Sequence, residues 1–342
     1  MAQALERSSR DHTQLRSRRA LIGLALLAVL SGLSGIAIGS TPIPPGSVIA
    51  AALGHGDPVA TAVVVEIRLP RALLGLAIGA MFGMSGAALQ GYLRNPLAEP
   101  SVLGVSNAAA LGAVMALYFG LANSFALALP LTAVFTAVLA LALVVALSRW
   151  SDSALTLVLA GIAVGTLAGA AISLALNLSP NPFAAMEITN WLLGSLEDRS
   201  LKHVALAVPF IALGMALLIW DGHALDALTL GEDTAATLGF DLKAIRLRLV
   251  LGVALGVGGA VSVCGSIGFV GLIVPHIVRP LVGSKPSRLL IPSALAGASL
   301  LTVSDVLVRI IPATNELKLG VVTSFLGVPF FLLLLFRNRR AW

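Results

Sequence analysis

The chain has 342 residues, of which 58% are hydrophobic and only 11% charged, and its formal net charge is +6. A soluble protein has about a quarter of its residues charged, so this composition excludes an ordinary soluble domain. Apolar stretches of about 20 residues, each long enough to cross ~30 Å of hydrocarbon, recur along nearly the whole chain. The sequence therefore predicts an all-α, polytopic membrane protein.

We expect about ten transmembrane helices, each matching one apolar stretch. In chain order they are Ala20–Ile38, Arg68–Leu93, Val102–Phe119, Phe125–Leu147, Leu155–Leu178, Val204–Trp220, Leu247–Ile267, Phe269–Val282, Leu289–Ile311 and Leu319–Phe336. The third and eighth are short or contain glycine and proline, so they are not expected to cross as simple rods.

The segments before and after these spans are polar. Residues 1–19 are expected to form a disordered cytoplasmic tail, 20–337 a single transmembrane domain, and 338–342 a short cytoplasmic tail. A basic start followed by an apolar run also resembles a signal peptide, but the run is long and further spans follow, which favours an uncleaved first span.

The basic residues indicate the orientation of the bundle. Arginines precede the first span and follow the last, whereas the loops 41–60 and 120–124 contain no lysine or arginine. Because cytoplasmic loops carry the excess of basic residues, both termini are predicted to be cytoplasmic. The exceptions on the external side are Arg68, Arg71, Arg199, Lys202, Arg309 and Lys318.

Two parts of the chain have a faint similarity to each other. Gly79–Gln90 and Gly252–Gly265 are both small-residue helices that run into a turn with proline, at Asn95-Pro96 and Pro275-His276. With opposite orientations, the two halves would form the inverted repeats common in transporters.

The sequence gives no support for catalysis by this chain. The glycine-rich run Gly252–Gly265 lacks the Lys-Ser/Thr ending of a phosphate-binding loop and suits helix packing instead. The five histidines have no metal-ligand spacing, and Cys264, the one cysteine, is expected to be a packed thiol. We therefore expect no enzyme activity, no metal site and no cofactor bound by the chain itself.

A cytoplasmic loop contains a candidate docking helix. Glu232 and Asp233 suit the first turn of a short helix, and Gly239 is placed to end it with a left-handed residue. Ala235, Ala236 and Leu238 would give that helix a small apolar face for a groove of a soluble partner. The alternative is an ordinary connecting loop.

Asp305 and Arg309 are four residues apart in the ninth span, so they share a helix face. One interpretation is an internal ion pair that lets the helix carry both charges. The other leaves Arg309 free to meet an external partner beside Arg68 and Arg71.

Taken together, the motifs resemble the FecCD-type permease subunits of ABC importers for iron-siderophore, haem and cobalamin. The resemblance covers about residues 60 to 337. The motifs that carry it are Arg68-Leu-Pro-Arg71, Gly86 with Gln90, Asn95-Pro-Leu-Ala-Glu-Pro100 with Leu103-Gly104, Trp191-Leu-Leu-Gly-Ser195, Leu230-Gly231 with Ala235 and Leu238-Gly239, Gly268-Phe-Val-Gly-Leu with Pro275-His276 and Arg279, Pro292 with Gly297-Ala298, Asp305 with Arg309, Glu316, Gly320, and Gly327 with Pro329-Phe330.

The resemblance implies a type II ABC importer permease fold in the bacterial inner (plasma) membrane. It implies a second copy of the chain (a homodimer) or a paralogous permease, two ATPase subunits that hold ATP and Mg, and a periplasmic or lipid-anchored substrate-binding protein. The cargo would be an iron(III) chelate, haem or cobalamin, and family frequency favours an iron chelate. No nucleic-acid partner is implied.

The resemblance also implies roles for individual residues. Arg68, Arg71 and Arg309 would meet acidic residues of the binding protein. The ATPase coupling loop would be Leu230, Gly231, Glu232, Asp233, Ala235, Leu238 and Gly239. A cytoplasmic gate would be formed by Asn95, Leu97, Ser153, Ala154 and Leu155, while the fifth and tenth spans would line the pathway at the interface of two permeases.

The sequence departs from the family pattern at one position. The family usually has proline two residues after the glutamate that matches Glu316, where this chain has Lys318. Losing that proline removes a φ restraint at the start of the last span and adds an external charge.

Two other classes of function are open to such a chain. An ion-gradient-driven secondary transporter would need carboxylates near the middle of the membrane, and here Asp305 is the only acid well inside a span. A membrane scaffold without transport activity would leave the docking helix without an ATPase to bind.

Overall fold

The computed structural model describes residues 2–121, 125, 127–148, 154–312 and 316–338. Every regular element in this part of the chain is helical. In order they are α1 (Ala2–Ala37), α2 (Pro45–Ala52), α3 (Pro58–Thr61), a π-helical segment (Ala62–Arg68), α4 (Leu69–Tyr92), a 3-10 turn (Pro100–Leu103), α5 (Val105–Tyr118), α7 (Ala128–Ser148), α8 (Ala154–Asn177), α9 (Pro182–Leu192), α10 (Leu201–Trp220), α11 (Gly222–Leu228), α12 (Glu232–Thr237), α13 (Leu242–Cys264), α14 (Val270–Val282), α15 (Pro286–Ile310) and α16 (Leu319–Asn338).

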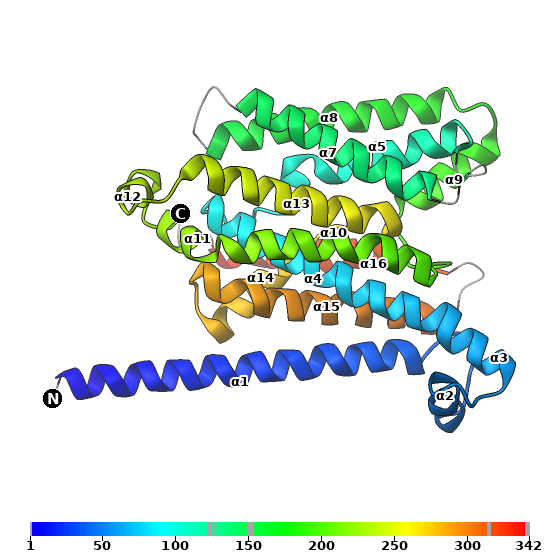
Figure 1. The fold of residues 1–342 in the computed structure, drawn as a ribbon, viewed down its shortest axis with the longest axis horizontal. Coiled ribbons are helices and arrows are strands. Elements are labelled where there is room, and N and C mark those ends of the chain that lie inside the picture. Colours follow the sequence, from blue (N-terminus) through cyan, green and yellow to red (C-terminus); the bar gives the residue numbers. More distant parts are fainter. Residues whose placement is uncertain (1, 122–124, 126, 149–153, 313–315, 339–342) are drawn as a thin grey trace.

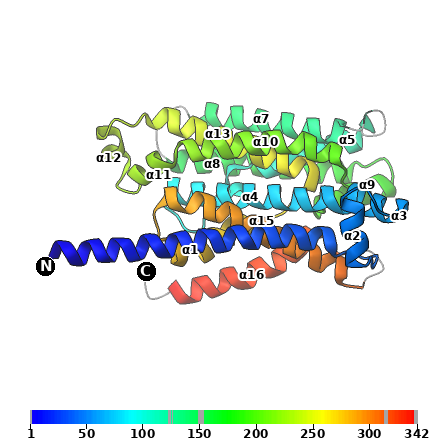
Figure 2. The same cartoon turned by 60° about the horizontal axis from the view of Figure 1, so that its bottom comes forward.

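The long helices lie side by side with their axes roughly aligned, although the chain runs up some and down others (Figures 1 and 2). α1 begins, α16 ends, and the short helices α11 and α12 lie at one end of this bundle, which we call the α12 end. The short helices α2, α3 and α9 lie at the opposite end, which we call the α2 end.

The predicted spans correspond to observed helices in every case. Among the described residues, seven helices are long and apolar enough to cross a membrane, and three shorter apolar helices accompany them, Val105–Tyr118, Val270–Val282 and Leu319–Leu333. The predicted third and eighth spans are α5 and α14, with 14 and 13 residues, so their expected shortness is confirmed.

The first helix differs from the expectation. It begins at Ala2, inside the segment 1–19 that the sequence suggested to be disordered. The physical reason lies in the composition, because residues 2–19 contain no glycine or proline and include alanine, leucine, glutamate and arginine, which are good helix formers. Of the predicted C-terminal tail 338–342, only Asn338 falls within the described residues, at the end of α16.

Glycine lets the two central helices approach closely. A Cβ atom on Gly79 of α4 would lie 2.3 Å from the carbonyl oxygen of Gly297 in α15, and one on Gly83 would lie 2.1 Å from that of Ser293. A Cβ on Gly256 of α13 would lie 2.2 Å from the sulfur of Met81. Small residues that allow backbones to touch are the usual means of helix packing in lipid. Cys264 is 1% exposed and unpaired, which confirms the packed thiol.

The two proposed repeats have the same order of elements. α4 is followed by a broken turn and the short helix α5, and α13 is followed by the non-helical residues 265–269 and the short helix α14. α4 runs toward the α12 end, whereas α13 runs away from it (Figure 1). This opposite direction agrees with inverted repeats.

The contact between α4 and α15 gives the first prediction. The variant Gly79→Ala should lose about 1–3 kcal/mol of stability, because the added methyl group overlaps the Gly297 carbonyl. The control is Gly23→Ala on α1, where an added Cβ meets nothing within 4 Å. Thermal unfolding of the purified chain in detergent measures both, and a Gly79→Ala variant as stable as the control would contradict this packing.

Candidate functional site

A cavity of about 630 Å³ at the α12 end brings two sets of predicted residues together. The turn after α4, the start of α8 and the start of α12 all contribute to its wall. Its lining residues are Leu93, Arg94, Asn95, Leu97, Ala98, Val102, Ala154, Leu155, Val158, Gly231, Glu232 and Asp233. Four of the five candidate gate residues and three of the coupling-loop residues therefore border one space, and the fifth gate residue, Ser153, lies outside the described residues.

The turn after α4 is fixed by its own hydrogen bonds. Arg94 adopts a positive φ of 49°, which turns the chain as the helix ends. The Asn95 side-chain oxygen accepts a 2.9 Å bond from the Leu97 amide, and the Asn95 carbonyl accepts one from Ala98. Asparagine is favoured in such turns because its side chain can bond the backbone two residues on. As a result, Leu97 is 36% exposed beside the cavity.

A buried amide holds this turn against α14. The Gln90 side-chain nitrogen lies 3.4 Å from the carbonyl oxygens of Ala98, Gly271 and Leu272. Its side-chain oxygen accepts a 3.0 Å bond from Arg279 of α14. Gln90 is 4% exposed, and a buried polar group that bridges several elements fixes their relative positions. The sequence marked Gln90 and Arg279 only as parts of motifs, because their pairing across 189 positions has no local signal.

Another close backbone contact brings α8 to the cavity. Gly104 has a φ of +71°, and a Cβ atom there would lie 2.4 Å from the Gly161 carbonyl oxygen of α8. The chain between the 3-10 turn and α5 thus rests directly on α8. One consequence is that Ala154 and Leu155, in the first turn of α8, face the same space as Leu97.

The predicted docking helix is present as α12. Glu232 and Asp233 lie in its first turn, and Gly239 has a φ of +89°. The amide of Phe240 donates to the Ala235 carbonyl and that of Gly239 to the Ala236 carbonyl, which is a Schellman cap.

The apolar face of α12 differs from the expectation. Ala235 is fully buried and packs inward against the core, whereas Leu238 is 60% exposed and Leu230 is 67% exposed. Of the predicted face, Ala236 and Leu238 are exposed, so with Leu230 they form the outward apolar surface at this end. Six residues make too few turns for sequence periodicity to separate the two sides.

At the α2 end, a cluster of charges (Arg68, Arg71, Asp305, Arg309 and Glu316) joins α1, α4, α15 and the segment before α16. Arg71 of α4 bonds Asp305 of α15 at 2.9 Å and also pairs with Glu316, which precedes α16. Arg309 lies 3.0 Å from Asp305 along the same helix. The internal ion pair predicted for Asp305 and Arg309 is therefore confirmed. The sequence did not predict the bond between Asp305 and Arg71, which are 234 positions apart in the chain.

Two of these arginines also hold the end of α1. Arg68 donates to the carbonyl oxygens of Ile36, Ala37 and Thr41. Arg309 donates to those of Gly35 at 2.9 Å and Ile38 at 3.1 Å. The last carbonyls of a helix have no partner within the helix, so these guanidinium groups satisfy them. Arg68, Arg71 and Arg309 are 3%, 5% and 8% exposed, and a role in docking stays a prediction for them.

Lys318, where the family usually has proline, has an internal partner. Its ammonium group lies 2.8 Å from Glu197 in the loop between α9 and α10. The Gly320 amide donates to the Gly194 carbonyl of the same loop. The start of α16 is thus held by contacts in place of the φ restraint that proline would supply.

Three known proteins have sequences similar to this chain over most of its length. The chain is 40% identical over 333 residues to the uncharacterized ABC transporter permease protein YvrB of Bacillus subtilis, covering 94% of each. It is 36% identical to the vitamin B12 import system permease protein BtuC of Klebsiella pneumoniae, covering 95% of this chain and 96% of the other. It is 38% identical to the hemin transport system permease protein HmuU of Yersinia pestis, over 80% of this chain and 83% of that one.

A solved structure described as an inward-facing conformation of a metal-chelate type ABC transporter has the same fold. Its TM-score is 0.84 at 31% identity, and the match covers 94% of this chain and 99% of that chain. Fold and comparisons together define a multi-pass membrane permease of the ABC-transporter class, a transport component rather than a catalyst. Residues 25–337 match the FecCD transport family, and the chain belongs to that family.

The charge cluster gives the second prediction. The variant Asp305→Asn should lose about 3–5 kcal/mol of stability, because it leaves two buried arginines facing each other without their shared carboxylate. The control Glu197→Gln removes a carboxylate from a partly exposed pair and should change stability by less than about 1 kcal/mol. Unfolding of the purified variants in detergent measures both stabilities. An equal loss of stability in the two variants would contradict the structural role of the cluster.

Proposed function

We propose that this chain is the translocation subunit of an ATP-driven importer for a metal-centred organic ligand. The observation that carries the proposal is the 630 Å³ cavity, which borders both the start of α12 and the candidate gate at Asn95, Leu97 and Leu155. A displacement of α12 would change the shape of the space beside the gate. Energy released by a soluble ATPase could therefore reach the pathway without a nucleotide site in this chain.

The distribution of exposed basic residues supports a cytoplasmic α12 end. Arg16, Arg18, Arg19, Arg94, Lys243, Lys285 and Arg288 are exposed there. At the α2 end the three arginines of the cluster are buried and bonded. Cytoplasmic surfaces carry the excess of lysine and arginine, so both termini belong on the cytoplasmic side of a bacterial inner membrane.

The surface around α12 suits a soluble ATPase subunit. Leu230 and Leu238 supply exposed apolar groups, while Asp233 supplies exposed negative charge at the start of the helix. Two ATPase subunits would be engaged by two permeases. A capped helix in a groove is a recurrent way for proteins to bind each other.

The charge cluster suits a binding protein with acidic lobes. It contains three arginines, Arg68, Arg71 and Arg309, and two carboxylates, Asp305 and Glu316, so the cluster itself keeps one positive charge. A local positive charge of this kind would set the register of an acidic partner more than it would add affinity.

The face of α8 supports a pathway between two copies of the chain. Thr166 in the middle of this helix and Ser173 in its last third are exposed, and each hydroxyl donates to a carbonyl of its own helix. Lipid-facing positions rarely need such residues, whereas a water-filled pathway tolerates them. α16 adds exposed apolar side chains, including Phe325 at 77% exposure.

The proposed cargo is an iron(III) siderophore, haem or cobalamin. The names of the relatives cite vitamin B12, hemin and metal chelates, which share a metal held in a large organic ligand. Uptake of radiolabelled iron chelate, haem and cobalamin in a strain lacking this chain identifies which one it carries. Uptake of all three unchanged by the deletion would contradict the proposed cargo class.

The described residues give little support to a transporter driven by an ion gradient. Such a protein needs a carboxylate that can bind the coupling ion near the middle of the membrane. Asp305 is fully buried and already shared by Arg71 and Arg309. Its charge is neutralised by permanent cations.

The third prediction tests the ATPase surface. The variant Leu230→Asp/Leu238→Asp should lose co-purification with the ATPase subunits, because it places charge on both exposed leucines. Folding should be unaffected, since each is at least 60% exposed. The control Leu53→Asp changes a leucine of similar exposure at the α2 end and should keep the ATPase. Normal ATPase binding by the double variant would refute docking at α12.

The fourth prediction tests the gate. Because the natural Cys264 is buried, a single cysteine placed at Leu97 reports access to the cavity. In the complex with ATPases, a non-hydrolysable ATP analogue should change the rate at which Leu97→Cys reacts with a water-soluble maleimide by at least about tenfold, as expected if a site moves between open and closed states.

The matched control is Lys202→Cys, which is exposed at the α2 end. Its reaction rate should not depend on nucleotide. Equal nucleotide responses at both positions, or none at Leu97, would count against a gate coupled to α12.

A further inference from the structure

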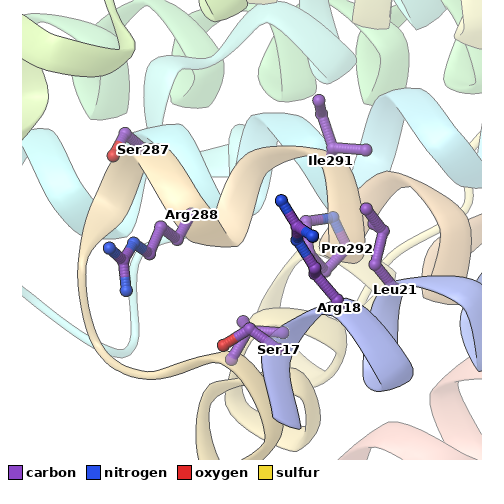
Figure 3. Close-up of a pocket in the computed structure, with 8 residues that line it drawn as sticks. Ser17, Arg18, Leu21, Ser287, Arg288, Ile291 and Pro292 are labelled. Atoms are coloured by element: carbon purple, nitrogen blue, oxygen red, sulfur yellow. The ribbon is translucent and has the colours of Figure 1, made fainter. Parts of the chain in front are cut away.

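A second cavity, of about 400 Å³, opens at the α12 end between α1, α14 and α15. It is separate from the gate cavity and shares no lining residue with it. It is lined by Ser17, Arg18, Leu21, Val282, Ser287, Arg288, Ile291 and Pro292. Figure 3 shows Arg18 extending from α1 toward Ile291 and Pro292, with Ser17 and Arg288 on the neighbouring parts of the wall.

The two arginines of this cavity have no counter-ion. Among the described residues, neither the Arg18 nor the Arg288 side chain has a hydrogen-bond or ion-pair partner, and both residues are exposed. The neighbouring basic groups are already bonded. Arg16 donates to the Pro280 carbonyl at 3.3 Å, and Lys285 pairs with Asp226 at 3.2 Å.

Among the described side chains, the acid close to this cavity is Asp226, and it is also satisfied. The Asp226 carboxylate accepts bonds from the Ser287 amide at 2.9 Å and the Ser287 hydroxyl at 2.7 Å, in addition to its pair with Lys285. It therefore fixes the start of α15 and does not neutralise Arg18 or Arg288. The residues that line the cavity therefore keep a net positive charge.

The other wall of the cavity is apolar and continues onto the surface that faces lipid. Leu21 is 38% exposed and Ile291 is 48% exposed, and both are at the edge of the opening. Only 22% of the apolar stretch of α1 is buried inside the bundle, so most of the helix beyond Leu21 is left on the outer surface. A ligand that fits this cavity therefore has an anionic head and an apolar tail that runs along α1.

We propose that this cavity binds the phosphate headgroup of an anionic phospholipid, with the acyl chains along α1. Basic pockets between helices on the cytoplasmic side are suited to such headgroups. Guanidinium groups can bind phosphate oxygens with two parallel hydrogen bonds. The apolar continuation distinguishes a lipid from a soluble phosphate, which would gain nothing from Leu21 or Ile291. Bound lipid would also fill the space between α1 and α15.

Native mass spectrometry of the full chain in detergent, titrated with phosphatidylglycerol, tests the site. The variant Arg18→Ala/Arg288→Ala should bind this lipid about 25-fold more weakly, at about fivefold for each basic residue near an anionic lipid. The control Arg19→Ala/Lys243→Ala removes the same charge from exposed positions outside the cavity and should bind within about twofold of the parent. Equal weakening in both variants would overturn the proposal.

Two further measurements on the unaltered chain separate the alternatives. Phosphatidylcholine should not compete, and excess inorganic phosphate should not displace phosphatidylglycerol. Displacement by inorganic phosphate would indicate a soluble-anion site and overturn the lipid assignment. A phosphatidylglycerol with a photoreactive acyl chain should crosslink to α1 and α15 near Leu21 and Ile291. Crosslinks that form only elsewhere would overturn the lipid assignment. If Arg18→Ala/Arg288→Ala lost ATPase binding but kept its lipid binding, the cavity would be a contact site for a protein, and the proposal would also be overturned.

Discussion

The fold depends on one constraint, which is that charged and polar groups within a membrane must find their partners inside the protein. Arg71, Asp305, Arg309 and Glu316 meet that constraint by pairing with one another, and Arg68 and Arg309 by binding the last carbonyls of α1. These contacts join α1, α4, α15 and the segment before α16 at the α2 end. Away from this end, α4 and α15 pack backbone to backbone through Gly79 and Gly297. A rigid centre of this kind leaves conformational change to the periphery.

The α12 end is built differently. Its cavity is bordered by a proline-containing turn, the first residues of α8 and a six-residue helix. Gln90 and Arg279 anchor one side of the turn to α14. Leu230 and Leu238, which flank α12, remain exposed. Under the proposed function, an external partner that moves α12 would act on the wall of the candidate gate, while the buried charges at the far end would hold the other helices in place. Such transport would need no nucleotide-binding site within the chain.

Much of the fold could be predicted from the sequence because its signals are local. Each apolar stretch became a helix, and Gly239 ended α12 in the left-handed conformation. The partners of individual charges could not be predicted, since Arg71 and Asp305 are 234 positions apart and the spacing of Asp305 and Arg309 suggested only the shorter contact. The inward turn of Ala235 was also beyond reach, because a helix of six residues has no clear periodicity. The continuation of α1 to Ala2 follows from helix-forming residues whose polar character suggested a tail.

The central claim is that this chain forms a passive pathway whose movement is imposed from outside at α12. The most direct measurement is uptake of metal-centred cargo into sealed vesicles. The vesicle membrane contains the chain with its ATPase subunits, and the binding protein delivers the cargo from outside. Uptake should require ATP hydrolysis and should be unaffected when proton and sodium gradients are collapsed. Uptake by the chain alone, driven by such a gradient in vesicles without nucleotide, would contradict the account.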